Sequence, residues 1–221
     1  MTAHPNPLLD GPRLAPIAGG KPTGLVVLLH GYGSNGHDLI SLARVIQRSL
    51  PGIAFVAPDA PSLMPRMAKA HQWWPIESFS PAERAAGVAG AAPDLDRFLS
   101  DELKSHGLGD DRLLIVGFSQ GAMMALHVGL RRRHPIAGII GISGMLVDPG
   151  SLEAEITNRP PVLLIHGTAD DVVPFRSLEL AANALSAAGV PVTTHVSRGL
   201  GHSVDQDGLA AAAAFVARVL P

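Results

Sequence analysis

Residues 113–121 read Leu113-Leu114-Ile115-Val116-Gly117-Phe118-Ser119-Gln120-Gly121. This short apolar run leads into a Gly-x-Ser-x-Gly motif, and a helix-forming segment, residues 122–133, follows. The order predicts a strand, a sharp turn and a helix, with the turn lifting the Ser119 hydroxyl clear of the sheet edge. Side chains at positions 117 and 121 would collide with the crossing strand and helix, which accounts for the two glycines. Because Gly and Ser are common in turns, the motif alone is also compatible with an ordinary loop serine.

Apolar runs recur along the chain and alternate with segments of helical periodicity. Most runs are apolar at every position, which is typical of strands buried on both faces of a parallel sheet. Strands are expected at residues 25–29, 53–57, 113–117, 136–142, 161–165 and 192–196, with a short edge strand near 14–17, and helices at 37–49, 81–106, 122–133, 177–188 and 205–220. This alternation predicts an α/β fold with a mostly parallel sheet flanked by helices. Pro93 is expected to kink or split the long helix 81–106.

The composition is that of a globular protein with one domain, residues 1–221, in which residues 1–20 look irregular. Hydrophobic residues make up 47% and charged residues 16%, and a net charge of -2 argues against nucleic-acid binding. The absence of cysteine excludes disulfides and thiolate chemistry. No apolar run approaches a membrane span and no signal peptide is recognisable, so a cytoplasmic location is expected. The basic cluster 131–133 is expected at a helix C-terminus, where cations are favourable.

Four polar, glycine-rich segments follow predicted strands, and all fall at the carboxyl edge of the sheet, where α/β proteins gather functional groups. Ser119 is a poor nucleophile without a base, and His202, in a Gly-His-Ser loop after the last strand, is the best candidate. Asp170 would orient the imidazole, and Asp171 is its rival by one position. The ordinary alternatives are a solvated loop histidine and an Asx turn. The order Ser119, Asp170, His202 is that of α/β-hydrolases.

The same loops offer backbone donors for an oxyanion. The N–H of Gln120, directly after the nucleophile, is expected to supply one donor, and the N–H of Tyr32 the other. Gly31 and Gly33 let that backbone approach a substrate closely. The convergence of four segments therefore predicts a site for acyl transfer more specifically than any one motif does.

Residues 58–81 form a long, proline-rich stretch, and loops of this length inside a compact domain usually carry function. We expect this stretch to form one wall of the pocket, with Trp74 as the main aromatic contact and Leu63, Met64 and Ile76 as further candidates. The alternative for each of them is that it only seals the loop onto the core. Between residues 142 and 162 there is room for a short loop, so no lid domain is expected and the site should be open and shallow.

Together these segments carry a family resemblance. Residues 29–33 (LHGYG), 72–76 (QWWPI), 117–121 (GFSQG), 166–174 (HGTADDVVP) and 201–203 (GHS) resemble the carboxylesterase/phospholipase family of α/β-hydrolases, which includes the acyl-protein thioesterases. The resemblance covers nearly the whole chain, from about residue 25 to residue 220. It implies an α/β-hydrolase fold, a triad of Ser119, Asp170 and His202, and an oxyanion hole at Tyr32 and Gln120. Related esterases often form homodimers, so a homodimer is a further expectation.

These residues favour a serine carboxylesterase that hydrolyses small-molecule esters with short to medium acyl chains. An acyl thioesterase or a lysophospholipase would use the same triad, and a non-catalytic, hydrolase-like receptor is the alternative from another class. The histidines show no metal-ligand spacing, so neither a metal nor a cofactor is expected. The expected partner is the ester substrate, with no nucleic acid and no membrane span.

Overall fold

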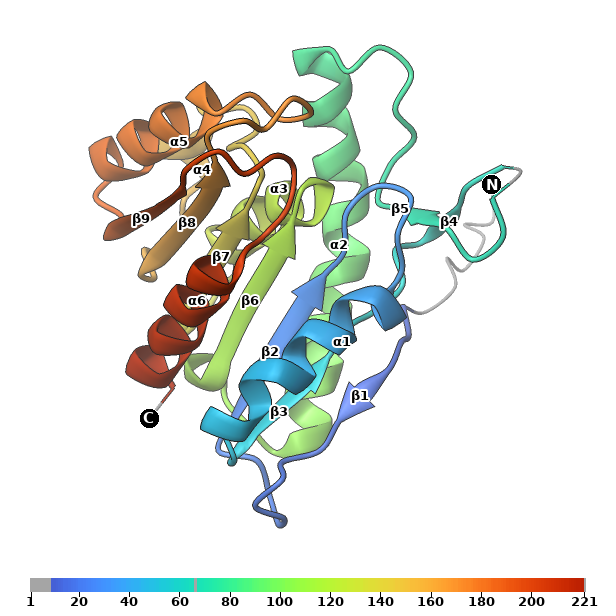
Figure 1. Cartoon of the computed structure of the whole chain (residues 1–221), viewed down its shortest axis with the longest axis vertical. Coiled ribbons are helices and arrows are strands. Elements are labelled where there is room, and N and C mark those ends of the chain that lie inside the picture. The colour runs from blue at the N-terminus through green and yellow to red at the C-terminus, as the bar shows by residue number, and fades with distance from the viewer. Residues whose placement is uncertain (1–8, 66, 221) are drawn as a thin grey trace.

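The computed structural model describes residues 9–65 and 67–220, and a seven-stranded sheet in the order β1-β3-β2-β6-β7-β8-β9 forms its centre (Figure 1). The strands are β1 (Arg13–Leu14), β2 (Gly24–Leu29), β3 (Ile53–Val56), β6 (Leu113–Phe118), β7 (Gly138–Ile142), β8 (Val162–Gly167) and β9 (Val192–Ser197). β1 pairs antiparallel with β3, and the other neighbouring strands of this sheet pair in parallel. The predicted mostly parallel sheet is therefore confirmed. Residues 1–8 of the N-terminal segment expected to be irregular lie outside the described residues.

Helices cover both faces of the sheet. They are α1 (Gly36–Ile46), α2 (Pro81–His106), α3 (Gln120–Gly129), α4 (Leu152–Glu155), α5 (Arg176–Ala187) and α6 (Gln206–Val219), with short 3₁₀ turns η1 (Gln47–Ser49) and η2 (Asp110–Arg112). Figure 1 shows α1 and α6 in front of the sheet and α2 and α3 behind it. A two-stranded hairpin, β4 (Ser62–Leu63) with β5 (His71–Gln72), lies within the long loop before α2. Between β7 and β8 the chain forms only the four-residue helix α4, so this segment contains no lid domain.

The continuous apolar runs reflect burial of the strands on both faces. In β2, Leu25 and Val27 belong to the core cluster shared with α2, α3 and α5, whereas Val26 and Leu28 belong to the cluster shared with α1 and α6. Because successive side chains of a strand point to opposite faces, a strand between two helical layers must be apolar at every position. The periodicity that predicted a parallel sheet therefore has this two-sided core as its cause.

The long helix α2 begins as its sequence predicts and is continuous through Pro93. Pro81 occupies its first turn, and the Ser80 hydroxyl caps it by accepting from the Glu83 N–H at 3.2 Å. The helix is not split at Pro93 but continues to residue 106. Proline removes the bond to the carbonyl of Ala89, and because both residues are exposed, water can satisfy that carbonyl. The missing bond therefore lies on the solvent side.

The helix after the elbow is shorter than predicted. It ends at Gly129 rather than at residue 133, so the basic cluster lies beyond the helix. Arg131 still meets the expectation of a cation at a helix end, because its guanidinium donates to the carbonyl of His127 in the last turn at 3.2 Å. For Arg132 the expectation is wrong, because its side chain turns inward.

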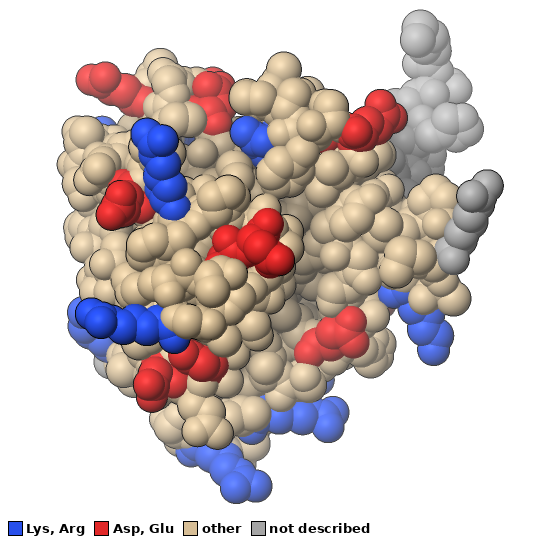
Figure 2. All heavy atoms as spheres, turned by 45° about the horizontal axis from the view of Figure 1, so that its top comes forward, with Lys and Arg blue, Asp and Glu red and all other residues tan. Residues whose placement is uncertain are grey.

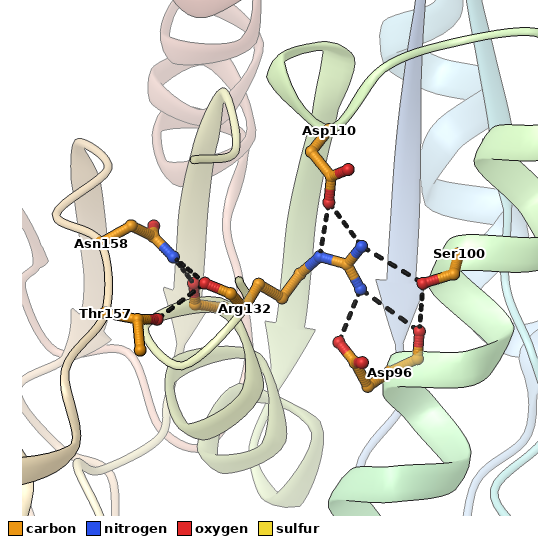
Figure 3. Close-up of polar contacts among 7 residues, drawn as sticks. Asp96, Ser100, Asp110, Arg132, Thr157 and Asn158 are labelled. Carbon is orange, nitrogen blue, oxygen red and sulfur yellow. Dashed lines mark hydrogen bonds and ion pairs between the residues drawn. The ribbon is translucent and has the colours of Figure 1, made fainter. Parts of the chain in front are cut away.

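Arg132 joins three segments of the chain (Figure 3). Its side chain is 6% exposed and forms ion pairs with Asp96 of α2, at 2.7 Å, and with Asp110 of η2. Its main-chain carbonyl accepts from Thr157 Oγ1 and Asn158 Nδ2, each at 2.7 Å. One residue therefore ties α2, η2 and the segment before β8 together, on the face of the sheet that carries α2 and α3.

Candidate active site

The Gly-x-Ser-x-Gly segment forms a sharp turn between β6 and α3, with Ser119 at φ 54° and ψ -117°. Non-glycine residues rarely adopt positive φ, and such strain, about 1–3 kcal/mol, persists only where the surroundings enforce it. A Cβ atom at Gly117 would lie 2.2 Å from the Gly121 carbonyl oxygen, and one at Gly121 would lie 2.1 Å from the Leu29 carbonyl oxygen. Close backbone approach therefore requires both glycines, as the motif predicts.

Asp170 and His202 lie in the loops after β8 and β9, and their side chains are hydrogen-bonded. His202 Nδ1 lies 2.9 Å from Asp170 Oδ2 and 3.0 Å from Oδ1. The N–H groups of Val172 and Val173 also donate to Oδ1, at 3.0 and 2.8 Å. The Asp170 side chain is fully buried, whereas Asp171 is exposed. Of the two rival carboxylates, Asp170 is the one that contacts the imidazole.

The surroundings of Asp170 keep its carboxylate ionised. Burial raises the pKa of Asp170, but the hydrogen bonds from His202 and from the Val173 N–H outweigh this effect, so the pKa lies below its ordinary value. An ionised carboxylate beside Nδ1 favours the imidazole tautomer that has its proton on that nitrogen. Nε2 of His202 is then left as the basic nitrogen.

Packing places the His202 ring next to the elbow. The ring contacts Phe118, the residue before Ser119, with 4.9 Å between ring centroids and an interplanar angle of 50°. The end of β8 also approaches the His202 loop closely, since a Cβ atom at Gly167 would lie 2.2 Å from the Leu200 carbonyl oxygen. The fold therefore joins His202 to Asp170, 32 positions away in the sequence, and places its ring against the residue directly before Ser119.

The two predicted oxyanion donors also lie at the elbow. A Cβ atom at Gly31 would lie 3.2 Å from the Cβ of Ser119, so the loop that carries Tyr32 passes directly beside the nucleophile. Among the described residues, the backbone N–H groups of Tyr32 and Gln120 have no hydrogen-bond acceptor. Gln120 begins α3, and the first N–H groups of a helix carry its positive dipole end. Both groups are therefore available to a developing negative charge.

The side chain of Gln120 has a second role that the sequence did not predict. It is buried, its Oε1 accepts from the Trp73 N–H at 2.8 Å, and its Nε2 donates to the Trp74 carbonyl at 2.9 Å. One amide therefore satisfies a donor and an acceptor of the long loop before α2. The sequence signal was a polar residue at the first position of an otherwise apolar helix, which can identify a buried amide but not its partners.

The loop that carries Tyr32 is fixed to the long loop by histidines. His30 is fully buried, and its Nε2 accepts from the Ala60 N–H at 2.9 Å, so Nδ1 carries the proton and donates to the Gly31 carbonyl at 2.7 Å. Burial lowers the pKa of His30 and favours this neutral form. In the hairpin, the His71 carbonyl accepts from the Gly33 N–H at 2.9 Å. These contacts hold the predicted oxyanion loop and the pocket wall together.

The four predicted substrate contacts lie in different environments. Trp74 is 5% exposed, and its ring packs against α2. Leu63, in the hairpin, is 65% exposed, and Ile76 is half-buried. Met64 is half-buried with its sulfur 3.6 Å from the Cβ position of Gly33, beside the oxyanion loop. For Trp74, sealing the loop onto the core is the role that these contacts describe, and substrate contact by all four residues stays a prediction.

A large apolar groove lies beside the triad loops. It has a volume of about 1090 Å³, and two of its walls are the segment after Asp170 and the segment that follows β7. The third wall is the N-terminal end of α2, which projects beyond the sheet edge in Figure 1. Its apolar lining comprises Phe79, Pro81, Ala82, Ala85, Met145, Leu146, Val147, Pro149, Val172, Pro174, Leu180, Ala181 and Ala184. Sequence reasoning missed this groove because its walls come from three distant segments.

Charge and metal ligands contribute little to this side of the molecule. Figure 2 shows a mostly uncharged face with acidic and basic side chains scattered over it. In the described part of the chain, no three His, Asp or Glu side chains are placed to hold a metal ion. Within the same residues, each helix is too short or too polar to cross a membrane.

Comparison with known proteins identifies the family. Residues 17–220 match the family described as Phospholipase/Carboxylesterase. The chain belongs to this family. It is 32% identical to acyl-protein thioesterase 1 of Neurospora crassa, over 95% of this chain and 92% of that protein. The crystal structure of esterase PE8 is 46% identical and superposes with a TM-score of 0.92 over 96% of this chain and 99% of that one.

The same fold occurs in a solved structure of lower sequence identity. Acyl-protein thioesterase 2 of Zea mays is 24% identical and has a TM-score of 0.73 over 96% of this chain and 99% of that one, which shows a common fold. The expected α/β-hydrolase fold and the resemblance to carboxylesterases are thus confirmed. As a member of this family, the protein is a serine hydrolase that acts on ester bonds.

Proposed function

We propose that this family member is a carboxylesterase that hydrolyses short- to medium-chain carboxylic esters through an acyl-enzyme at Ser119. The observation that carries the proposal is the buried Asp170–His202 hydrogen bond, with the His202 ring packed on Phe118 directly before the strained Ser119. The proposed catalytic unit is one α/β-hydrolase domain.

The proposed reaction has two steps. In the first, Ser119 Oγ attacks the ester carbonyl while Nε2 of His202 takes its proton, and the alcohol leaves with that proton. In the second, water activated by the same nitrogen cleaves the acyl-enzyme and releases the acid. Asp170 keeps the imidazole oriented and stabilises its positive charge in both steps. The N–H groups of Tyr32 and Gln120 stabilise the oxyanion, where each donor typically contributes about 10²–10³ in rate.

We further propose that the acyl chain lies in the groove between α2 and α5. The lining is mainly apolar, and each buried methylene contributes up to about 0.8 kcal/mol to binding. Within residues 9–65 and 67–220 no lid domain covers the groove, so soluble esters can enter without an interface. Hydrolysis of short p-nitrophenyl esters should therefore follow ordinary saturation. A requirement for micelles before any turnover would contradict an open site.

The first test is covalent labelling by a fluorophosphonate probe. The native protein should be labelled and should hydrolyse p-nitrophenyl butyrate, and Ser119→Ala should do neither. Comparison of Asp170→Asn with Asp171→Asn tests the acid, because only the first should lose activity by orders of magnitude. Loss of activity in Asp171→Asn alone would exclude Asp170 as the triad acid.

A thioesterase is the second candidate, and the relatives named acyl-protein thioesterase favour it. A thioester passes through the same acyl-enzyme, so the triad geometry does not separate the two activities. A series of matched esters and thioesters of increasing acyl length does. We expect higher kcat/KM for the oxygen esters, and the reverse order would assign the protein to acyl thioesters. Lysophospholipids complete the panel.

A non-catalytic receptor with the same fold would bind ligands in the groove without labelling at Ser119. The complete set of triad and oxyanion residues speaks against it. A cytoplasmic location and a homodimer stay predictions. Sedimentation of the purified protein tests the dimer directly.

A further inference from the structure

A second histidine contacts the carboxylate of Asp170. His166, in β8, has a side chain that is 2% exposed, and its Nε2 lies 3.3 Å from Asp170 Oδ2. The same nitrogen lies 2.8 Å from the carbonyl oxygen of Val173. The ring is wedged against Phe175, with 6.1 Å between centroids and an interplanar angle of 77°. Both side chains of this contact are buried, and the two-step reaction does not use it.

The two neighbours of Nε2 determine its protonation. A main-chain carbonyl and an ionised carboxylate can only accept hydrogen bonds, so Nε2 of His166 must carry a proton and donate it. Placing a lone pair there would bring three acceptors together in a buried site, where each unpaired polar group costs about 1–3 kcal/mol. The structure therefore requires the Nε2–H form of this imidazole.

We propose that His166 is a positioning residue for the triad carboxylate: its Nε2–H donates to the Val173 carbonyl, and the same nitrogen lies 3.3 Å from Oδ2 of Asp170. This inference rests on the proposed function, in which Asp170 acts on His202. Asp170 Oδ1 accepts from two main-chain N–H groups and lies 3.0 Å from His202 Nδ1, whereas the contacts of Oδ2 with the described residues are the two imidazoles. His166 thus contacts one of the two carboxylate oxygens that face the base. Through the carbonyl of Val173 it also ties that turn to the end of β8.

The carboxylate has few other charged neighbours. Across residues 9–65 and 67–220, the titratable side chains in contact with it are His166 and His202, and the adjacent Asp171 points to solvent. Removal of the His166 donor leaves the negative charge less compensated. The carboxylate then holds the protonated form of the facing imidazole more strongly, which moves the acid limb of kcat/KM to higher pH.

The test uses two substitutions of His166 and one matched control. His166→Leu fills a similar volume without a donor, whereas His166→Gln retains an N–H at about the same reach. The control is Thr168→Ala, which removes the bond from the Gly199 N–H to Thr168 Oγ1 (2.8 Å) between the same two loops but does not touch the carboxylate. Kinetics use p-nitrophenyl butyrate from pH 5 to pH 9.

In His166→Leu we expect kcat to fall about tenfold with KM unchanged and the acid limb to rise by about half a pH unit, because the variant loses the hydrogen bond to the Val173 carbonyl and the polar N–H beside the carboxylate. His166→Gln should recover most of kcat and the wild-type acid limb of kcat/KM. Thr168→Ala should also show the wild-type acid limb. Unchanged kcat and pH profile in His166→Leu would overturn the proposal. If His166→Leu does not unfold cooperatively, His166→Gln alone tests the proposal. Near-native kinetics of His166→Gln would support the positioning role of His166, and loss of activity in that variant would refute it.

A spectroscopic measurement separates this inference from the proposed function. With ¹⁵N-labelled histidine, His166 should give the Nε2–H tautomer at neutral pH, whether or not any ester is turned over. The Nδ1–H tautomer would refute the contact even in an active enzyme. If the wild-type protein neither hydrolyses esters nor reacts with the fluorophosphonate, the esterase proposal is refuted. The tautomer of His166 is still determined by the ¹⁵N spectrum in that case.

Discussion

Replacement of Arg132 by methionine should destabilise the fold without touching the candidate site. In the native protein the guanidinium forms ion pairs with Asp96 and Asp110 and also donates to Ser100 Oγ at 3.4 Å and to the Asp96 carbonyl at 3.2 Å (Figure 3). Methionine keeps most of the aliphatic stem, so the change removes charge and hydrogen bonds but little packing. The bonds to the Arg132 carbonyl remain.

The magnitude follows from the exposure of the groups left behind. Breaking a fully buried ion pair costs about 3–5 kcal/mol, because it leaves an uncompensated buried charge. Here the side chains of Asp96 and Asp110 are 54% and 23% exposed, so water can solvate both carboxylates after the arginine is gone. The expected loss is therefore about 2–3 kcal/mol. For a protein of this size such a loss lowers Tm by about 4–12 °C.

The assay is thermal and urea denaturation of Arg132→Met beside Arg133→Met, the adjacent arginine, which is exposed. The control should change Tm by no more than about 2 °C, as surface substitutions usually do. Activity towards p-nitrophenyl butyrate should remain near native in both variants at 25 °C. Equal Tm values for the two variants would refute the inference that the buried guanidinium contributes to stability. A selective loss of kcat in Arg132→Met would show that the cluster acts on the site instead.

Three further predictions concern the site and its surroundings. Gln120→Leu leaves the Trp73 N–H and the Trp74 carbonyl without partners, so it should lower both Tm and kcat/KM; unchanged kinetics would show that this clamp is dispensable. Burial, followed by the nearby Arg131 charge, lowers the pKa of His127 to about 4, so the unfolded chain binds an extra proton below about pH 6.5. The stabilisation that neutral His127 contributes is full above that pH and is lost as the pH falls towards 4. The urea midpoint of His127→Gln should therefore depend less on pH than that of the wild type, and an equal pH dependence in the two proteins would contradict this. Leu180→Arg adds a charge to the groove at a 57% exposed position and should reduce hydrolysis of decanoate more than of butyrate, whereas an equal effect on both would exclude the groove as the acyl site.

The sequence predicts most of the sheet because the continuous apolar pattern of a strand results directly from its burial on both faces. A strand covered on both faces must be apolar throughout, and four of the six expected parallel strands match the structure to within one residue at each end. The strand expected at residues 161–165 continues to Gly167. The strand expected from residue 136 begins at Gly138. The helix boundaries are less well predicted, because tertiary contacts decide them. The helix α3 ends at Gly129, and Arg132 then turns towards two acidic side chains from distant segments. The sequence around Arg132 does not indicate these partners, so it does not predict where the helix ends.

The candidate triad was predictable for a topological reason. Parallel strands bring their carboxyl ends to one edge, so residues directly after β6, β8 and β9 must gather there whatever their separation in sequence. The contact of His166 with Asp170 was not predictable, because a histidine at the end of a buried strand is equally compatible with ordinary core packing. The same limit applies to Trp74, for which composition indicated a pocket contact and the structure shows a ring packed against α2.

The backbone strain at Ser119 explains why so many polar side chains serve the surrounding loops. A positive φ at a non-glycine residue persists only when neighbouring segments leave the chain no alternative. Here the elbow is enclosed by the oxyanion loop at Gly31, and the Gln120 amide fixes the long loop to the start of α3. His30 joins those two loops to each other through the Ala60 N–H. The buried polar contacts thus place the two candidate oxyanion donors before any substrate binds, which is the condition under which such donors accelerate acyl transfer.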